Sequence, residues 1–575
     1  MTSVQPLVLD ASAVRAWISQ DPDGSTRAEL ESLLVRHDAG DHEATSRLAD
    51  AFRGALRFGT AGLRGQLGAG PNRMNRAVVI RAAAGLSAYL CEQVGEGFTV
   101  VIGYDARHGS RQFAVDTAAV VQGAGGRAML FEQPCPTPVL AFALLRLKAD
   151  AGVMVTASHN PAQDNGYKVY LGGRAMTGAG CGAQIVPPYD AEITRRIDAV
   201  GPLNEIRLRE SGWSVLGPEM VEEYTARVSH CARAEAASDL RIVLTSLHGV
   251  GGQICRDALG RVGFKQVLVV PEQFSPDPDF PTVTFPNPEE PGALDMALAL
   301  ARESDADLVI ANDPDADRCA VAVPDPCSEG GWRQLTGDEL GALLGEQAAG
   351  LAAFTGQGVL ASSIVSSRLL RRIAHAHGLA HRRTLTGFKW ISRVPNLAYG
   401  YEEALGYCVD PACVHDKDGI SAAVRVAVLA SVLQAQRRSL LDLLDRLARE
   451  HGLHATAALS LQVEEPEAIA QAMERLRAGG APAHLAGSPV VQELDLLEGA
   501  DDGVGGQLPP TDALVWTTAA DDQVVVRPSG TEPRLKCYCE VVLPVGDRPV
   551  AEVRQEAAAR LEALHADLRG TLCLP

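Results

Sequence analysis

Apolar strand patterns alternate with helix-length segments from about residue 74 to residue 156, and this alternation constrains the fold more than any other feature. A helical pattern begins near Met74. The pattern then predicts strands over 98–103, 127–131 and 152–156, and helices over 110–122 and 138–148. Strands that alternate with helices are typical of a layered α/β unit, so we expect one in this part of the chain.

Similar alternation continues along the chain. A second unit opens with the apolar strand 240–244 and runs to about residue 323, and a third begins near residue 336 and ends with helices over 420–448. From about residue 454 strands dominate, and we expect them over 457–463, 490–496, 523–526 and 535–542. The 56 residues before Arg57 are predicted to be helical, whereas seven prolines within 271–291 predict an irregular segment.

Composition narrows the class of protein. Hydrophobic residues make up 46% of the 575, enough for the cores of roughly four domains at ~150 residues each. The net charge of −19 argues against a nucleic-acid partner, which requires a basic face. No apolar run approaches the length of a membrane span and the first 14 residues do not resemble a secretory signal, so neither is expected. The twelve cysteines include no Cys-x-x-Cys pair and predict reduced thiols in the cytoplasm.

Residues 156–161 read Thr-Ala-Ser-His-Asn-Pro and follow an apolar strand. A serine on a tight turn at a strand end, with His159 beside it and Lys168 downstream, is positioned like a nucleophile or a phosphate carrier. Serine, asparagine and proline are also common in ordinary turns. The segment alone therefore leaves both interpretations open.

The segment 312–318 reads Asn-Asp-Pro-Asp-Ala-Asp-Arg and follows the apolar strand 308–311. In an extended segment the carboxylates of Asp313, Asp315 and Asp317 point the same way and repel one another unless a cation lies among them. Such oxygen ligands suit Mg²⁺. A calcium EF-hand is excluded because its glycine and glutamate positions hold Arg318 and Pro324. A solvated acidic turn is the alternative.

Two further segments carry the features of anion sites. Residues 527–534 read Arg-Pro-Ser-Gly-Thr-Glu-Pro-Arg, in which arginines, hydroxyls and a glycine predict a phosphate cradle rather than a plain hairpin turn. Residues 57–65 contain glycines at 59, 62 and 65, which predict a flexible loop that holds Arg64 against a charge.

Together and in this order, the four segments resemble the α-D-phosphohexomutase superfamily, which includes phosphoglucomutases and phosphomannomutases, from about residue 57 to residue 540. Residues 103–107 (Gly-Tyr-Asp-Ala-Arg), 386–391 (Thr-Gly-Phe-Lys-Trp-Ile) and 402–407 (Glu-Glu-Ala-Leu-Gly-Tyr) add to the similarity. The last two are most similar to the branch of bacterial phosphoglucomutases of about this length and phosphopentomutase-like enzymes. The resemblance implies three similar α/β domains with mixed sheets and a smaller C-terminal α+β domain around a central cleft.

With this resemblance we expect five segments: a helical extension over 1–56, domain 1 with a phosphoserine loop over 57–215, domain 2 with a metal loop over 216–330, domain 3 with a sugar loop over 331–453, and domain 4 with a phosphate loop over 454–575. The resemblance also implies roles. Ser158 would carry the phosphate, assisted by His159, Lys168 and Arg64, and Mg²⁺ would be bound by Ser158, Asp313, Asp315 and Asp317. The residues implied to bind substrate are Arg318, Gly387, Lys389, Glu402, Arg527, Ser529, Gly530, Thr531 and Arg534.

The implied reaction interconverts α-D-glucose 1-phosphate and glucose 6-phosphate, with glucose 1,6-bisphosphate as intermediate and activator, in a cytoplasmic monomer or weak homodimer. Ala404 departs from the family pattern, since many hexomutases carry a serine there. Phosphopentomutase and phosphomannomutase activities therefore stay open. A haloacid-dehalogenase-type phosphatase fits less well because Asp317 and Arg318 follow its Asp-x-Asp pattern. The remaining alternative is a non-catalytic phosphosugar-binding protein.

Overall fold

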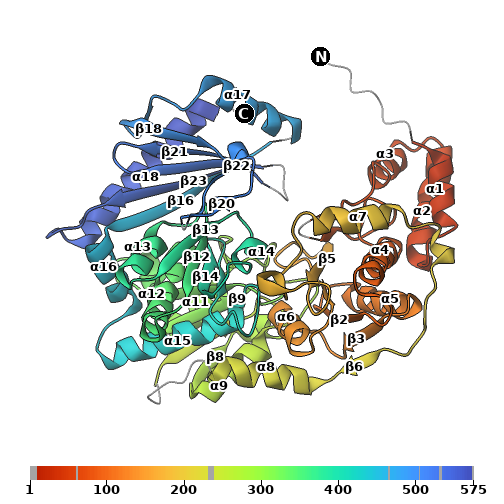
Figure 1. Cartoon of the computed structure of the whole chain (residues 1–575), viewed down its shortest axis with the longest axis horizontal. Helices are drawn as coiled ribbons and strands as arrows, with labels where there is room; N and C mark the ends of the chain where they lie inside the picture. The colour runs from red at the N-terminus through yellow and green to blue at the C-terminus, as the bar shows by residue number, and fades with distance from the viewer. Residues whose placement is uncertain are drawn as a thin grey trace. The chain divides into compact units, whose positions relative to one another are not determined.

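The computed structural model describes residues 9–59, 62–230, 239–463, 466–503, 505–529 and 534–572 (Figure 1). The chain divides into two compact units. The first contains Met1–Gln334 and Asp410–Val428, and the second contains Leu335–Val409 and Leu429–Pro575. The segment Asp410–Val428, which the sequence analysis assigns to domain 3, therefore packs within the first unit.

Three helices precede domain 1, as predicted: α1 (Ala11–Ile18), α2 (Gly24–Asp38) and α3 (His42–Ala51). Each helix is N-capped by an aspartate, namely Asp10, Asp23 and Asp41, whose side chain accepts hydrogen bonds from backbone N–H groups of the first turn. The apolar sides of the helices form a small core of their own around Leu30 and Leu48.

Domain 1 is built on a six-stranded mixed sheet in the order β1-β5-β4-β2-β3-β6. Its elements are β1 (Leu63–Gln66), α4 (Arg76–Val94), β2 (Thr99–Tyr104), α5 (Ser110–Gly123), β3 (Arg127–Phe131), α6 (Thr137–Arg146), β4 (Ala151–Val155), β5 (Asp164–Leu171), η1 (Gly178–Gly180), α7 (Tyr189–Asp198), η2 (Leu203–Glu205) and β6 (Ser214–Leu216). The strands and helices predicted over 98–156 end within two residues of the observed ones. Strands β3 and β4 pair with opposite sides of β2, so the strand order reverses at β2. In open α/β sheets, ligands bind at the carboxyl edge of the sheet at such a switch point.

Helix α4 is long and apolar enough, by length and composition, to cross a membrane, and α15 (Gly419–Ala435) with α16 (Leu440–His451) would also pass this test as a pair bent by 87°. A buried core helix has the same composition. Most of the qualifying window of α4 is buried within the protein, and side chains such as Val79, Leu86 and Tyr89 belong to the domain 1 core. We therefore interpret α4 as a core helix.

Domain 2 carries a five-stranded sheet in the order β11-β10-β9-β7-β8. Its elements are α8 (Pro218–His230), β7 (Arg241–Thr245), α9 (Gly252–Val262), β8 (Gln266–Val269), α10 (Pro271–Phe274), α11 (Asp295–Glu303), β9 (Leu308–Asn312), β10 (Cys319–Pro324), η3 (Glu329–Gly331) and β11 (Trp332–Gln334). The proline-rich segment is irregular after the short helix α10, close to the prediction. Strand β9 is buried at every position, in agreement with its apolar sequence over 308–311.

Domain 3 has a four-stranded sheet in the order β13-β12-β14-β15. Its elements are α12 (Gly337–Thr355), β12 (Val359–Ser363), α13 (Leu369–Ala376), β13 (Ala380–Thr384), α14 (Phe388–Ile391), β14 (Leu397–Glu402) and β15 (Gly406–Cys408), followed by α15 and α16. Thr336 and Glu339 form a capping box at the start of α12, so local sequence defines where this helix begins.

Domain 4 contains a six-stranded antiparallel sheet in the order β16-β23-β22-β21-β18-β17. Its elements are β16 (Leu453–Gln462), α17 (Pro466–Gly479), β17 (His484–Leu485), β18 (Ser488–Asp495), η4 (Leu496–Glu498), β19 (Ala500–Asp501), β20 (Gln507–Leu508), β21 (Leu514–Thr518), β22 (Gln523–Pro528), β23 (Arg534–Leu543) and α18 (Val550–Leu572). Figure 1 shows α18 lying along this sheet, and its buried side chains recur at helical spacing from Val550 to Leu572. The predicted fold class, three α/β domains and a C-terminal α+β domain, is confirmed.

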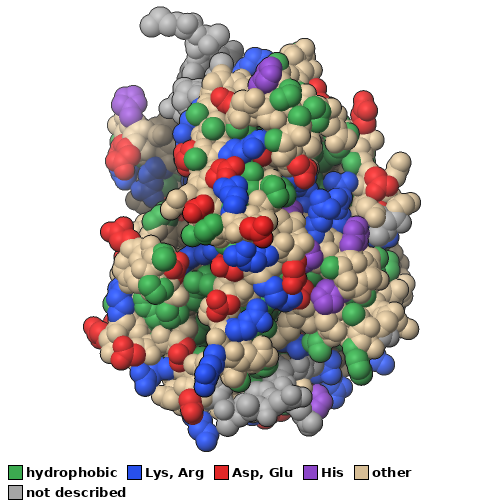
Figure 2. Space-filling view, turned by 90° about the vertical axis from the view of Figure 1, so that its left-hand side faces the viewer, with side chains coloured by type: hydrophobic (Ala, Val, Ile, Leu, Met, Phe, Trp, Pro, Cys, Tyr) green, Lys and Arg blue, Asp and Glu red, His purple; other side chains and the backbone are tan. Residues whose placement is uncertain are grey.

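Acidic and basic side chains are interspersed on the face of the molecule that Figure 2 displays. Ion pairs between neighbouring helices include Arg446 with Glu346 and Arg554 with Asp445. The cations visible on this face are thus largely mixed with carboxylates rather than gathered apart from them.

Candidate active site

Ser158 lies in the loop between β4 and β5, at the carboxyl edge of the domain 1 sheet. Its backbone has a φ of 52°, in the left-handed region that a serine seldom occupies. Its buried hydroxyl donates a 2.8 Å hydrogen bond to Asp313 Oδ2 and lies 3.2 Å from His159 Nδ1. The serine that is expected to carry the phosphate therefore contacts the acidic loop of domain 2.

Asp313, Asp315 and Asp317 are all buried, and one carboxylate oxygen from each lies within 4.8 Å of the others. The predicted reason for their convergence is wrong, because the segment is a turn and not an extended strand. Ala316 has a φ of 53°, and its N–H donates to the carbonyl of Asp313 at 2.8 Å. This reversal of the backbone, rather than strand alternation, brings the carboxylates together.

The chemistry of these side chains fits a divalent cation. Asp315 Oδ1 and Asp317 Oδ1 are buried and have no hydrogen-bond partner among the described residues. Burial, and then the charges of Asp317 and Asp315, raise the pKa of Asp313 well above its ordinary value. A buried acceptor without a donor is costly, and hard carboxylate oxygens are the ligands that Mg²⁺ prefers. Asp313, Asp315 and Asp317 are therefore suited to hold Mg²⁺.

Two lysines approach the same carboxylates. Lys168 lies on β5, and its Nζ is 2.7 Å from Asp315 Oδ2 and 2.9 Å from Asp317 Oδ2. Burial alone lowers the pKa of Lys168, but the charges of Asp315 and Asp317 outweigh it and raise the pKa above its ordinary value. The Nζ of Lys417, from the segment before α15, lies 3.2 Å from Asp317 Oδ2. Sequence reasoning missed Lys417, although its setting in Asp-Lys-Asp-Gly (416–419) was a visible signal.

Arg64 and Arg318 add positive charge near this cluster. Arg64 belongs to strand β1, opposite Gly166 of β5, and donates to Asn160 Oδ1 at 3.1 Å. The prediction that Arg64 sits in a flexible loop is wrong, since antiparallel pairing with β5 orders this stretch. The backbone N–H of Arg318 donates to Asp313 Oδ1 at 3.0 Å, and the residue's Nη1 lies 3.5 Å from Glu289.

His159 is an uncharged neighbour of the serine. Burial, and then the positive charges of Arg318 and Arg64, lower the pKa of His159 well below its ordinary value. A neutral imidazole at 3.2 Å can exchange a proton with the Ser158 hydroxyl, so His159 is placed for that role.

Thr137, a residue of domain 1, holds Asp315, the middle of the three aspartates. As the first residue of α6, it donates through its backbone N–H to the carbonyl of Asp315 at 2.9 Å and through its hydroxyl to Asp315 Oδ2 at 2.6 Å. Sequence reasoning did not select Thr137, because nothing local distinguishes it from an ordinary helix-capping threonine.

The expected sugar-binding residues lie in the second unit. Gly387, with a φ of 100°, precedes α14, which carries Lys389. Strand β14 ends at Glu402. The next residue, Glu403, is turned inward and accepts hydrogen bonds from the hydroxyls of Ser363 at 3.1 Å and Ser366 at 3.0 Å. Glu403 thus anchors the expected sugar-binding loop, residues 402–407, to Ser363 and Ser366 at and just after the end of β12.

The expected phosphate loop closes the β22–β23 hairpin. Arg527 lies near the end of β22, Arg534 begins β23, and the N–H of Ser529 donates to the carbonyl of Arg534 at 2.8 Å. Gly530 and Thr531 lie outside the described residues. The pKa of Tyr538 is raised by burial and by the charges of Glu403 and Glu402, while Arg527 opposes this. Charges of both segments thus act on Tyr538, a residue that sequence reasoning did not select.

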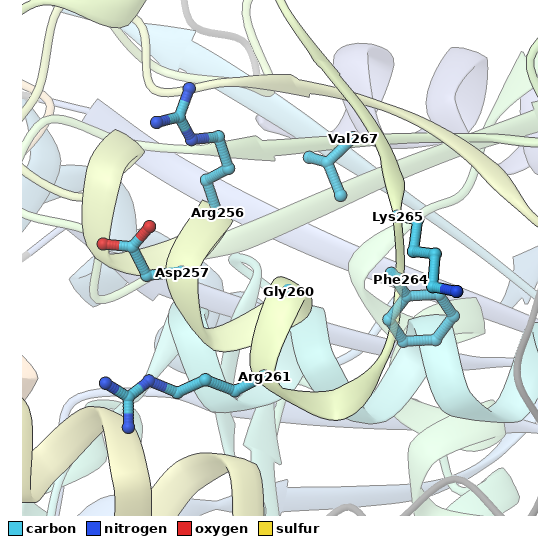
Figure 3. Close-up of a pocket in the computed structure, with 7 residues that line it drawn as sticks. All are labelled: Arg256, Asp257, Gly260, Arg261, Phe264, Lys265 and Val267. Carbon is cyan, nitrogen blue, oxygen red and sulfur yellow. The ribbon is translucent and has the colours of Figure 1, made fainter.

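A surface pocket of about 550 Å³ in domain 2 does not coincide with this chemistry (Figure 3). It is lined by Arg256, Asp257, Gly260, Arg261, Phe264, Lys265 and Val267. Arg261 is paired with Glu222 at 2.6 Å, and Arg256 stacks 5.2 Å from the ring centroid of Phe274. These two cations serve the packing of domain 2, and we assign no ligand to the pocket.

Three family models match the chain. They describe the alpha/beta/alpha domains I, II and III of phosphoglucomutase/phosphomannomutase and match residues 55–200, 222–329 and 336–451.

Known proteins of similar sequence cover nearly the whole chain. A "probable phosphomannomutase" of Haemophilus influenzae is 44% identical over 81% of this chain and 93% of its own length. A "phosphoribomutase" of Saccharomyces cerevisiae is 35% identical over 92% of both chains. A human "phosphopentomutase" is 34% identical over 95% of this chain and 94% of its own. The crystal structure of a putative phosphomannomutase from Thermus thermophilus has the same fold, with a TM-score of 0.66 and 24% identity over 90% of this chain and 99% of that one.

Proposed function

The chain belongs to the phosphoglucomutase/phosphomannomutase family of phosphomutases, and from this premise we propose that it moves a phosphate between two positions of one sugar by way of Ser158. One observation carries the proposal. The Ser158 hydroxyl donates to Asp313 Oδ2 at 2.8 Å, inside a buried group of three carboxylates that suits Mg²⁺. Phosphoryl transfer depends on positioning and charge neutralisation more than on covalent help, and this arrangement supplies both.

The metal role falls to Asp313, Asp315 and Asp317. An Mg²⁺ ion held by these carboxylates would supply electrostatic stabilisation of the charge on the transferring group. Thr137, Lys168 and Arg318 keep the carboxylates in place, since each contacts one or two of them directly.

The protein's own residues account for the protons. When Ser158 takes a phosphate from the sugar bisphosphate, the bond between phosphorus and the sugar oxygen breaks and a bond to Ser158 Oγ forms. In this step the Ser158 hydroxyl, which donates to Asp313 Oδ2 in the structure, turns to neutral His159 Nδ1 at 3.2 Å and passes its proton there. The ammonium of Lys168 protonates the departing sugar oxygen. The same steps run in reverse when phosphoserine donates its phosphate to a sugar monophosphate, so one site serves both halves of the cycle.

For the substrate, we propose α-D-glucose 1-phosphate, converted to glucose 6-phosphate through glucose 1,6-bisphosphate. Glu402 and Lys389 are assigned to the sugar hydroxyls, and Arg527, Ser529 and Arg534 to the phosphate that does not react. The second candidate is a pentose 1-phosphate. It is favoured by Ala404, which lacks the hydroxyl of many hexomutases, and by the yeast and human relatives named phosphoribomutase and phosphopentomutase.

The decisive experiment uses glucose 1,6-bisphosphate labelled with ³²P. Wild type is expected to carry label on Ser158 and to interconvert the sugar phosphates in Mg²⁺, whereas Ser158→Ala does neither. The matched control is Ser87→Ala, which removes a buried hydroxyl of domain 1 that has no hydrogen-bond partner among the described residues. Undiminished turnover in Ser158→Ala would overturn the proposal. Comparing kcat/KM for glucose, mannose and ribose 1-phosphates then identifies the preferred sugar.

A further inference from the structure

Arg107, in the loop between β2 and α5, donates hydrogen bonds to four carbonyls of the loop that carries Ser158. Its Nη2 lies 2.6 Å from the carbonyl of Ser158 and 2.5 Å from that of Asn160, and its Nη1 lies 2.7 Å from the carbonyl of Pro161 and 3.1 Å from that of Asp164. The five-donor, planar guanidinium is suited to bridging several acceptors at once. One side chain therefore ties together the start, middle and end of the loop.

The guanidinium is itself held from two further sides. Its Nε lies 3.3 Å from Asp105 Oδ2, and both side chains are only 1% exposed. The ring of Phe280 covers it, with Arg107 Cζ 4.8 Å from the ring centroid. An aromatic face attracts a cation most strongly where water is excluded. Phe280 therefore both packs against Arg107 and interacts with its charge.

Phe280 comes from the proline-rich segment of domain 2, the domain that supplies the three aspartates. The N–H of Phe280 donates to the carbonyl of Asp277 at 3.3 Å, and the N–H of Asp277 donates to the carbonyl of His248 at 3.0 Å. Val250 belongs to the same turn as His248. Its N–H donates to the carbonyl of Pro314, which lies within the aspartate loop, at 2.8 Å. A hydrogen-bonded path thus runs from the aspartate loop to Phe280.

The backbone of Ser158 makes such support necessary. A non-glycine residue with a φ of 52° persists only where its surroundings over-determine it. We propose that Arg107 is the positioning residue that holds Ser158 in this conformation, and that Phe280 keeps Arg107 aligned with the aspartate loop. This inference rests on the proposed role of Ser158 as phosphate carrier. The hydrogen bonds of Arg107 reach the reaction through the serine loop.

Two variants test the inference, Arg107→Lys and Phe280→Leu. Lysine has three donors for four carbonyls, and leucine fills space without an aromatic face. Both are expected to lower kcat about tenfold or more, with the KM for the sugar phosphate changed less than twofold and hydrogen exchange accelerated over 157–166. Phosphorylation of Ser158 by labelled bisphosphate should slow to the same extent as kcat.

The matched control is Phe274→Leu, which removes the aromatic face from another arginine pair of domain 2, with Arg256 at 5.2 Å. It is expected to lower Tm as Phe280→Leu does but to leave kcat unchanged. If Phe280→Leu and Phe274→Leu have the same kcat, or if Arg107→Lys keeps wild-type kcat, the inference is wrong while the phosphoserine scheme stands. If Ser158→Ala still turns over, the proposed function itself fails, whatever these variants do.

Discussion

Ser158 Oγ and Asp313 Oδ2 lie 2.8 Å apart although the two residues are separated by 155 positions in the chain and belong to different domains. The contact joins the residue expected to carry the phosphate to the first of three carboxylates suited to the metal. Both side chains are buried, so small changes in either loop alter a contact that water cannot replace.

The Asp313→Ala variant is expected to weaken Mg²⁺ binding by at least ~10-fold, because it removes a proposed ligand. Mutating a residue that merely hydrogen-bonds to a metal ligand already lowers metal affinity by about this much. Mg²⁺ titrations of turnover and of Tm measure the change. The exposed Asp279→Ala is the control. Equal Mg²⁺ affinity in Asp313→Ala and wild type would contradict the assignment of the cluster.

Removal of Mg²⁺ with EDTA is expected to abolish turnover and to lower the stability of the first unit, and restored Mg²⁺ should reverse both effects. A cation that binds only the folded protein stabilises it by about 2.7 kcal/mol at a hundredfold excess over its Kd. Thermal unfolding at several Mg²⁺ concentrations measures the shift. A Tm that is independent of Mg²⁺ in wild type would count against a site among these aspartates.

Gly337→Ala is expected to disturb the sugar loop. A Cβ at Gly337 would lie 1.8 Å from the carbonyl oxygen of Glu403, so the loop has to move. We expect a loss of ~1–3 kcal/mol in stability and a raised KM for the sugar phosphate. Gly350→Ala lies on the same helix α12, and beyond the local helix backbone no described atom is within 4 Å of the added methyl, so it should instead stabilise by ~0.5–1 kcal/mol. Equal KM values for both variants would contradict this.

Glu540→Gln is expected to lose more stability at neutral pH than in acid. Burial raises the pKa of Glu540, but the hydrogen bond and charge of His454 and the charge of Arg368 lower it to about 2. A depressed pKa stabilises the folded state above the unfolded value of 4.5, and the contribution is lost as the pH falls toward 2. The shift corresponds to about 3 kcal/mol.

Denaturation at pH 7 and at pH 3.5 measures the gap between wild type and Glu540→Gln, which should narrow in acid. The exposed Glu562→Gln on α18 is the control and should track wild type at both pH values. A gap that stays constant or widens in acid would show that Glu540 does not act through its charge.

Ala404→Ser is expected to shift selectivity toward glucose 1-phosphate. Restoring one hydroxyl that can bond the sugar is worth about 1 kcal/mol, or roughly fivefold in the ratio of kcat/KM for glucose over ribose 1-phosphate. Ala404→Gly, which adds no donor, serves as the control. An unchanged ratio in Ala404→Ser would mean that residue 404 does not contact the discriminating hydroxyl.

Much of the fold was predictable because it depends on neighbours in sequence. The buried strand β4 and the helices α5 and α6 follow from apolar periodicity, which reflects which face each element buries. Ser158 and the three aspartates could be selected for the same reason, since each stands directly after an apolar strand. The turn at Ala316 and the strand around Arg64 could not be predicted, because they depend on a backbone reversal and on pairing with β5.

By itself the sequence determined the element types and the fold class, and it pointed to candidate acid, base and phosphate-binding groups, because those properties reside in local patterns and in side-chain chemistry. Only the tertiary structure decided that Lys417 reaches Asp317, that Thr137 holds Asp315, and that Arg107 spans the serine loop. These contacts join segments far apart in the chain. They form only when buried polar groups from several loops satisfy one another at the edge of a packed sheet.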